Sequence, residues 1–463
     1  MTDLRALLRP RSVAVVGAAE RETSSGGAVM RNLRMSGFKG TVIPVNPKGG
    51  EMFGLPAKTK LSDINPPADL AVIVIRPDAV LDAVREAAAS GHKRLLILPG
   101  GFAEAGEVGR ARDAALRQFC TEHDVVVAGP NCAGFIDQLD PSQPFAATFL
   151  RDMPRGGPVA FVSQSGAVAE HVIAMSHEMN LPFGAIISVG NAMHLGMTEY
   201  VEHYGADPAC KVIALYVESF GDVARFRAVA RRVSRTKPII ALVGGRTAAG
   251  TGAVQRHTGS EAFDDRALDA LFADAGVIRV PTLRRLLIAA KGLGAFPQGL
   301  GQRVLILSNS GGPGVLATDA ATQEALQLPP LPEALARTLR DAMPPEAAIA
   351  NPLDLLADAR EDRFGLVFDE TIKQARASFD AILGIHVVPF MVDPEPVVLR
   401  LAELARAHDI PMMHTMMGTL QGKRDWFATL EAARVPTFDD CEEMAIAAGY
   451  CARYRQLIHG NFR

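Results

Sequence analysis

Short apolar runs alternate with amphipathic segments along the first 140 residues of this chain. Five runs have the length of a strand: 12–17 (SVAVVG), 41–46 (TVIPVN), 70–75 (LAVIVI), 94–100 (RLLILPG) and 125–131 (VVVAGPN). The segments between them, such as AVLDAVREAAASG, have the period of a helix. Continuous apolar strands separated by amphipathic helices predict a parallel sheet that is covered on both faces.

The same alternation occurs twice more, over residues 155–292 and 301–460, so that three modules are expected with the first at 1–140. The stretch LDPSQPFAATFLRDMPRGG reads as a linker after the first module. A length of 463 residues agrees with about three domains. The second and third modules open alike, with VAFVSQSGAVA and VLILSNSGGPGVLA, which favours a duplicated module.

Composition narrows the class of protein. Hydrophobic residues make up 48% and charged residues 21%, and the formal net charge is −3, which indicates a soluble globular protein without an electrostatic case for nucleic acid or an anionic membrane. The apolar runs are too short to span a membrane, and no signal peptide is recognisable. Five cysteines without CxxC spacing predict reduced thiols in a cytoplasmic protein.

The first strand–helix turn argues against a dinucleotide enzyme. Gly17 is followed by a long gap before Gly26, which breaks the G-x-G-x-x-G fingerprint. The second strand ends in VNPK, so Lys48 stands where an NAD enzyme carries an acid. A ligand with an extra phosphate, such as the adenosine end of coenzyme A, therefore fits better than NAD. A plain turn with an exposed lysine is the alternative.

The turn SQSGA, residues 163–167, follows a strand and opens a helix. It is no nucleophile elbow, because Ser163 stands where G-x-S-x-G requires glycine. Its small residues would let the amides of Ser165, Gly166 and Ala167 face a phosphate, aided by the helix dipole. SNSGGPG could serve likewise, although Pro313 lacks a donor. A tight turn without any ligand is an equal alternative for SQSGA.

Two further polar residues are candidates for chemistry. Glu218 closes the apolar run KVIALYVES, where a solvated strand end is the commoner interpretation. His257 lies in GTGAVQRHTGS, which predicts a flexible loop of small residues that could carry an imidazole nucleophile. A structural histidine is the alternative. No histidine or cysteine spacing predicts a metal site.

Taken together, several motifs resemble the NDP-forming acyl-CoA synthetases, relatives of succinyl-CoA synthetase. They span nearly the whole chain and include SVAVVGA, AGPNCAGF, GPVAFVSQSGA, ALYVE, HTGS, SNSGGPGVLATD and NPLDLL. The resemblance implies an α/β protein with an N-terminal Rossmann-like CoA-binding domain, followed by two flavodoxin-like domains with doubly wound parallel sheets. It implies the α-type half of an ADP-forming (acid-thiol) ligase.

The resemblance also assigns roles to residues. His257 would be the phosphorylated histidine and Glu218 would hold its ring. Ser163, Gln164, Ser165 and Gly166 would bind the phosphate. CoA would be bound by a larger set: Gly17, Ser24, Ser25, Gly26, Lys48, Pro77 and Asn131.

The implied reaction interconverts a small carboxylic acid, CoA and ATP with acyl-CoA, ADP and phosphate through phosphohistidine and an acyl phosphate. The sequence has no G-x-x-x-x-G-K-[ST] loop, so no P-loop triphosphate site is expected. The resemblance implies that ATP/ADP and Mg²⁺ are bound mainly by an ATP-grasp β-type subunit. We therefore expect an oligomer and no turnover by this chain alone.

Three positions depart from the family pattern: Val243 before GGR, His194 after GNAM, and Arg256 before His257. Because the carrier segment is altered, a catalytically silent protein that binds CoA or acyl-CoA on the same fold is the alternative function. His257 and Glu218 favour the enzyme.

Overall fold

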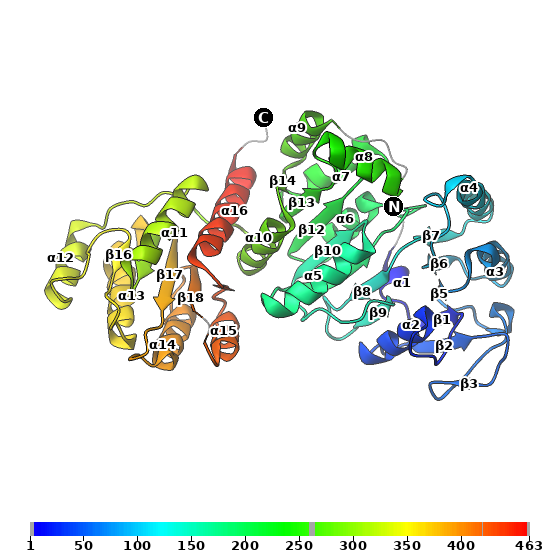
Figure 1. The fold of residues 1–463 in the computed structure, drawn as a ribbon, viewed down its shortest axis with the longest axis horizontal. Coiled ribbons are helices and arrows are strands. Elements are labelled where there is room, and N and C mark those ends of the chain that lie inside the picture. The colour runs from blue at the N-terminus through cyan, green and yellow to red at the C-terminus, as the bar shows by residue number, and fades with distance from the viewer. Residues whose placement is uncertain (1–3, 259–263, 419, 461–463) are drawn as a thin grey trace. The chain divides into compact units, whose positions relative to one another are not determined.

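The computed structural model describes residues 4–258, 264–418 and 420–460, which form two compact units, 1–283 and 284–463 (Figure 1). Both units are built from parallel sheets with helices between the strands, as the alternating pattern predicts. Among the described residues, no helix is long and apolar enough to cross a membrane. Each unit is described by itself below.

The first sheet of unit 1 has the order β2-β1-β5-β6-β7 and is parallel throughout. Val13 and Val15 of β1 point into one apolar core, while Ala14 points into another on the opposite face, so both faces are buried. The elements are β1 (Ser12–Val16), α2 (Ser25–Met35), β2 (Thr41–Val45), the short hairpin of β3 (Glu51–Met52) and β4 (Leu55–Pro56), β5 (Leu70–Ile73), α3 (Val80–Ala89), β6 (Arg94–Ile97), α4 (Gly106–Glu122) and β7 (Val126–Ala128).

The second sheet of unit 1 has seven strands in the order β14-β13-β12-β10-β11-β8-β9. Its parallel part corresponds to the predicted second module. The elements are β10 (Val159–Ser163), α5 (Gly166–Glu178), β11 (Phe183–Ser188), α6 (Met197–Ala206), β12 (Val212–Val217), α7 (Val223–Val233), β13 (Ile239–Val243), α8 (Ala248–Thr258), α9 (Asp265–Ala275) and β14 (Val277–Val280).

The predicted linker over 139–157 is wrong in part, because it contains a strand. β8 (Gly134–Asp137) and β9 (Phe145–Thr148) form an antiparallel hairpin, and β8 pairs antiparallel with β11. All eight residues of the hairpin strands are buried. Asp140, Pro141 and Pro144, which give this stretch the composition of a linker, belong to the turn between β8 and β9. The last residues of the predicted first module, those of β8, therefore form a strand of the second sheet.

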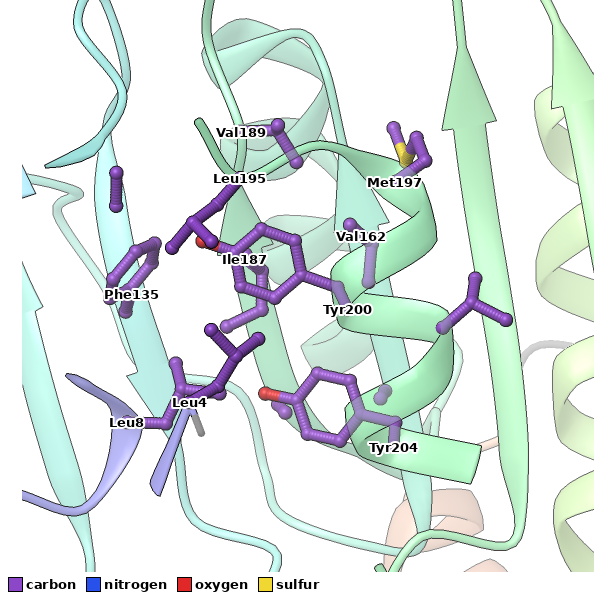
Figure 2. Close-up of a cluster of buried hydrophobic side chains, with 14 of the residues drawn as sticks. Leu4, Leu8, Phe135, Val162, Ile187, Val189, Leu195, Met197, Tyr200 and Tyr204 are labelled. Carbon is purple, nitrogen blue, oxygen red and sulfur yellow. The ribbon is translucent and has the colours of Figure 1, made fainter. Parts of the chain in front are cut away.

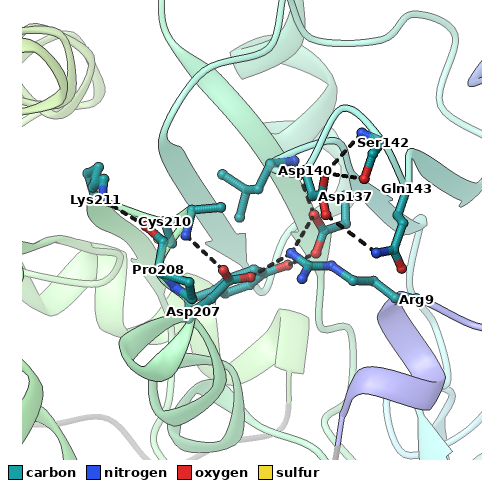
Figure 3. Close-up of polar contacts among 12 residues, drawn as sticks. Arg9, Asp137, Asp140, Ser142, Gln143, Asp207, Pro208, Cys210 and Lys211 are labelled. Atoms are coloured by element: carbon teal, nitrogen blue, oxygen red, sulfur yellow. Dashed lines mark hydrogen bonds and ion pairs between the residues drawn. The ribbon is translucent and has the colours of Figure 1, made fainter.

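One continuous apolar core joins the two sheets of unit 1. Leu4 and Leu8, which flank and end the short helix α1 (Arg5–Leu8), point toward Tyr200 and Tyr204 of α6 (Figure 2). Next to this core, Arg9 forms an ion pair with Asp207 at 2.6 Å (Figure 3). Burial raises the pKa of the neighbouring Asp137 to about 6, although the charge of Arg9 opposes this shift. The N-terminal segment is thus fixed to the second sheet.

Unit 2 contains one parallel sheet with the order β16-β15-β17-β18-β19. This order repeats that of β11-β10-β12-β13-β14, as the duplicated openings predict. This unit includes helix α10 except for its first residue, and the predicted start of the third module at 301 stays a prediction. The elements are α10 (Leu283–Ala295), β15 (Val304–Ser308), α11 (Gly311–Gln323), α12 (Glu333–Ala342), β16 (Leu353–Asp354), α13 (Glu361–Ala375), β17 (Ala381–Val387), α14 (Pro394–Ala407), β18 (Met412–Met417), α15 (Lys423–Ala432), β19 (Thr437–Phe438) and α16 (Cys441–His459).

Candidate functional site

A cleft of about 1340 Å³ lies in unit 1, where the loops after β1, β5 and β6 face the start of α5. Ligands of open parallel sheets bind at this edge, outside the carboxyl ends of the strands. Eight of the predicted site residues line the cleft: Gly17, Ser24, Ser25, Gly26, Asn131, Gln164, Ser165 and Gly166. Four others do not: Lys48, Pro77, Ser163 and Glu218.

The turn between β1 and α2 is shaped by close backbone contacts. Gly17 has φ of +90°, and a Cβ at Gly26 would overlap the carbonyl oxygen of Gly17. Ser24 caps α2, because its Oγ accepts the amide of Gly27 at 3.0 Å. The cleft thus includes a helix N-terminus whose first turn contains two glycines, Gly26 and Gly27, beside the Ser24 cap. That arrangement suits the phosphate of a ligand.

Cations line the cleft near this turn, but they are not the one predicted. Arg21, Lys60 and Arg76 belong to the lining, whereas Lys48 is exposed outside it and its amide donates to Asn46 Oδ1 at 2.9 Å. Pro77 follows Arg76 and lies against Gly101. The three cations come from different loops, so no local motif in the sequence indicated them. Contact between Lys48 and a phosphate remains a prediction.

Asn131 lies farther along the cleft and is fixed by a polar network. Asn131 has φ of +58°, and its side-chain amide Nδ2 donates to Asn191 Oδ1 at 3.2 Å. Asn191 in turn donates to Glu104 Oε2 at 2.6 Å. Burial opposes the ionisation of Glu104, but hydrogen bonds from Asn191 and from the Gly101 and Phe102 amides outweigh it and lower the pKa of this carboxyl.

Some residues of the SQSG turn stabilise the turn itself, and others are candidates for binding an anion. Ser163 is fully buried, donates to the carbonyl of Ser165 at 2.8 Å and accepts the Ser165 amide at 3.1 Å. The Ser165 amide is therefore engaged within the turn, contrary to the prediction that it faces a phosphate. Ser165 Oγ caps α5 by accepting the Val168 amide at 3.3 Å. The amides of Gly166 and Ala167, in the first turn of α5, remain as the candidate anion donors.

Gln164 connects this turn to Glu218. Its Oε1 accepts the amides of Glu218 at 2.5 Å and Ser219 at 2.9 Å, and its Nε2 donates to Ser219 Oγ at 3.0 Å. Gln164 therefore fixes the carboxyl end of β12. The sequence placed Gln164 in the anion site, but these bonds make it a residue that positions Glu218.

Glu218 is a buried carboxylate, with only 6% of its surface exposed. Burial, together with the charge of Glu218 and a hydrogen bond to it, raises the pKa of Tyr216 to about 12. A Cβ at Gly244 would lie 3.0 Å from Tyr216 Oη and 3.6 Å from Glu218 Cγ. Glu218 therefore lies beside the glycine turn that leads from β13 into α8.

His257 is part of α8 and not of the predicted loop. Thr247 Oγ1 accepts the Gly250 amide at 3.1 Å at the start of this helix, and the alanines that follow favour helix over loop. The side chains of Arg256 and His257 and the residues 259–263 lie outside the part of the chain that the structure describes. Whether His257 meets Glu218 and the SQSG turn therefore stays a prediction.

Two of the unusual positions have structural roles. His194 Nδ1 accepts the Val127 amide at 3.2 Å, and burial, with the charge of Arg117, lowers its pKa. It thereby connects the β11–α6 loop to the first sheet. Val243 is buried at the end of β13. The described residues contain no cluster of three or more side chains that could hold a metal ion.

The SNSGGPG turn of unit 2 repeats the geometry of SQSG. Ser308 donates to the Ser310 carbonyl at 2.8 Å and accepts the Ser310 amide at 3.1 Å. Its surroundings differ, because a Cβ at Gly311 would lie 3.1 Å from Asp354 Oδ2. A carboxylate thus already lies at the start of α11. This turn is a weaker anion site than the sequence suggested.

Three family models match consecutive parts of the chain: a CoA binding domain (11–138), a succinyl-CoA ligase like flavodoxin domain (156–293) and a Ligase-CoA domain (304–457). The α subunit of acetate–CoA ligase [ADP-forming] II from Pyrococcus furiosus is 32% identical over 446 residues, 95% of each chain. The 4-hydroxybutyrate–CoA ligase [ADP-forming] of Nitrosopumilus maritimus is 29% identical over 91% of this chain, which spans only 60% of that protein.

Among solved structures, a dinucleotide forming acetyl-coenzyme A synthetase 1 from Ca. Korarchaeum cryptofilum, in complex with phosphate and ADP, superposes with a TM-score of 0.91. It is 29% identical, and the match covers 99% of this chain and 98% of that one.

Proposed function

This chain belongs to the ADP-forming CoA ligase family, and we propose that it is an α-type subunit that binds CoA and carries a phosphoryl group on His257. One observation carries the proposal: a single cleft connects the glycine turn before α2 with the N-terminus of α5. A ligand with a nucleotide at one end and a thiol at the other, such as CoA, can therefore extend from the first sheet to the predicted phosphate site at the second sheet.

The proposed reaction interconverts a carboxylate, CoA and ATP with acyl-CoA, ADP and phosphate. In the synthetic direction, the carboxylate oxygen attacks the phosphorus of phosphorylated His257, the P–N bond breaks, and an acyl phosphate forms. The CoA thiolate then attacks the acyl carbon, and phosphate leaves as the C–O bond breaks. A covalent phosphohistidine divides one difficult transfer into two easier ones.

CoA fits the residues that line the cleft. Gly17 and Gly26 leave the backbone open at the N-terminus of α2, and Arg21, Lys60 and Arg76 supply positive charge for three phosphate groups. Asn131 would then stand near the thiol end. Cys132, which follows it, is buried, and burial raises the pKa of its thiol to about 12, so it is no competing nucleophile.

Glu218 would orient the His257 ring and stabilise its charged, phosphorylated form. Two contacts of Glu218 support this role. Gln164 accepts the backbone amide of Glu218, and the Glu218 carboxylate accepts a hydrogen bond from Tyr216. A buried carboxylate is costly unless it has such partners. Phosphate would bind opposite it at the Gly166 and Ala167 amides.

ATP and Mg²⁺ would be bound by a separate ATP-grasp subunit of the β type, and Mg²⁺ would neutralise the nucleotide phosphates there. The described residues offer no metal cluster of their own. His257 would then move between the SQSG turn and the partner, which requires a stable hetero-oligomer. We place the enzyme in the cytoplasm, since all five cysteines are buried free thiols.

The test is to assay the pure chain with ATP, Mg²⁺, CoA and acetate, with and without an ATP-grasp subunit of this family. We expect thioester formation only with both chains. Turnover by the pure single chain would contradict the two-subunit assignment. CoA binding without any turnover in the presence of a competent partner would favour a silent CoA-binding protein instead.

A further inference from the structure

Phe149 places an aromatic ring at the cleft, with 39% of its surface exposed. Its backbone cannot withdraw, because the Phe149 amide donates to the Ala133 carbonyl at 3.3 Å. The buried side-chain amide of Asn32 donates to the carbonyls on both sides of it, those of Thr148 and Leu150, at 2.8 Å each. An exposed ring on so rigid a backbone is an apolar surface held open for a ligand.

The backbone of Phe149 lies near the start of α5, and both line the same cleft. Phe149 bonds to Ala133, and a Cβ at Gly166 would lie 3.2 Å from Ala133 Cβ. Cys132 and Leu150 add apolar surface to the same stretch of the cleft. An apolar pocket therefore adjoins the two amides at which phosphate would bind, where the carboxylate of the acid must react.

Glu170 gives this pocket its charge. It stands four residues into α5 after Gly166, lines the cleft, and accepts the Arg151 amide at 3.2 Å through Oε1. The cations in the lining, Arg21, Lys60 and Arg76, all come from loops of the first sheet. Among the described residues that line the cleft, no cation accompanies Glu170 on α5. A second carboxylate on the substrate would meet repulsion here.

We propose that this chain selects monocarboxylic acids with an apolar body, and that Phe149 and Glu170 are the residues that select them. The Phe149 ring packs against the body of the acyl group, and Glu170 excludes dicarboxylates. The inference rests on the proposed function, because it needs the CoA thioester to end in this part of the cleft.

The test measures binding of three probes to the full chain by calorimetry: CoA, phenylacetyl-CoA and succinyl-CoA. Binding needs neither a partner subunit nor turnover. We expect phenylacetyl-CoA to bind at least about tenfold more tightly than succinyl-CoA, since one apolar pocket discriminates by about that factor or more. Equal affinity, or tighter binding of succinyl-CoA, would overturn the inference while CoA binding upheld the proposed function. Absence of CoA binding would overturn both.

Variants assign the effect to the two residues. Phe149→Ala should lower the affinity for phenylacetyl-CoA about tenfold relative to the affinity for CoA. Phe149→Leu should keep most of the affinity for phenylacetyl-CoA. Glu170→Gln should improve succinyl-CoA relative to phenylacetyl-CoA. Met35→Ala, which removes an exposed apolar side chain of α2 outside the cleft lining, is the matched control and should change neither ratio. If Phe149→Ala weakens all three probes equally, the ring serves CoA itself and the inference is wrong.

Discussion

The turns at Ser163–Gly166 and Ser308–Gly311 have the same backbone but different neighbours. In both, the first serine bonds to the carbonyl and amide two residues on, and the amide side chain that follows fixes the end of the adjacent strand. Gln164 accepts the amide of Glu218, and Asn309 accepts that of Val387 at 2.8 Å. Position for position, the buried carboxylate of one module is an apolar residue in the other.

The other side of each turn differs as well. Ser188 pairs with Ser163 and lies near Gly166, whereas Asp354 pairs with Ser308 and lies near Gly311. The first turn thus has an acid at the strand end and none at the helix start, and the second has the reverse. Duplication has kept the scaffold, and the neighbouring strand ends decide where an anion can bind.

The largest effect is expected from the acid that only the first turn has. Glu218→Gln should lower the level of phosphorylated His257 by about 10²-fold, because an oriented charge is lost at the reacting group. The level is measured by labelling the chain with acetyl-CoA and radioactive phosphate. Val387→Thr, at the equivalent position of unit 2, is the control. An equal loss in both variants would remove the distinction between the two turns.

The next largest effect is expected from low pH, which should lower the stability of unit 2 more than that of unit 1. In unit 2, His386 occupies the position of Val217, and burial lowers its pKa to about 4. His414 is also fully buried, and its pKa falls to about 3 through burial and the charge of His386. Their ring nitrogens have no hydrogen-bond partner among the described residues. The unfolded chain binds protons below pH 6.5 and the folded unit does not, so acid destabilises unit 2.

The loss should begin below pH 6.5 and reach about 2 kcal/mol for His386 at pH 5. Hydrogen exchange of peptides from 284–460 measures it, with peptides from unit 1 as the internal comparison. His386→Phe should flatten the pH dependence, whereas His171→Gln, at an exposed position of α5, should not. Unit 2 protection that is constant from pH 7 to 5 would contradict this.

The two amide residues offer a matched pair. Gln164→Ala and Asn309→Ala each remove side-chain bonds to a strand end and should destabilise the protein by about 1–2 kcal/mol in denaturant unfolding. Only Gln164→Ala should also reduce phosphorylation of His257, because only it releases Glu218. Reduced phosphorylation in Asn309→Ala alone would reverse the roles given to the two turns.

The smallest effect concerns the third helix start, that of α2. CoA should bind more tightly than dephospho-CoA and than NAD. Lys48→Ala should weaken CoA by no more than about 1 kcal/mol, because Lys48 is exposed outside the cleft lining. Arg76→Ala should cost more. A larger loss for Lys48→Ala in calorimetry would support direct contact between Lys48 and a phosphate of CoA, as predicted from the sequence.

Sequence patterns predicted the parallel sheets and the duplication, because continuous apolar strands and repeated turns are local signals. The sequence pattern did not predict β8 and β9, since the turn between them has the composition of a linker. Helix α8 was hidden by Gly250 and Gly252, which lower helix propensity. Phe149 and the three cleft cations gave no signal at all, because only the tertiary fold brings their loops to one cleft.

The most direct test of the central claim is the site of phosphorylation. The pure chain is incubated with acetyl-CoA and radioactive phosphate, and the modified residue is identified by mass spectrometry. The account predicts acid-labile, alkali-stable phosphate on His257, none in His257→Ala, and near-normal CoA binding by that variant. Undiminished labelling of the His257→Ala chain would contradict the account.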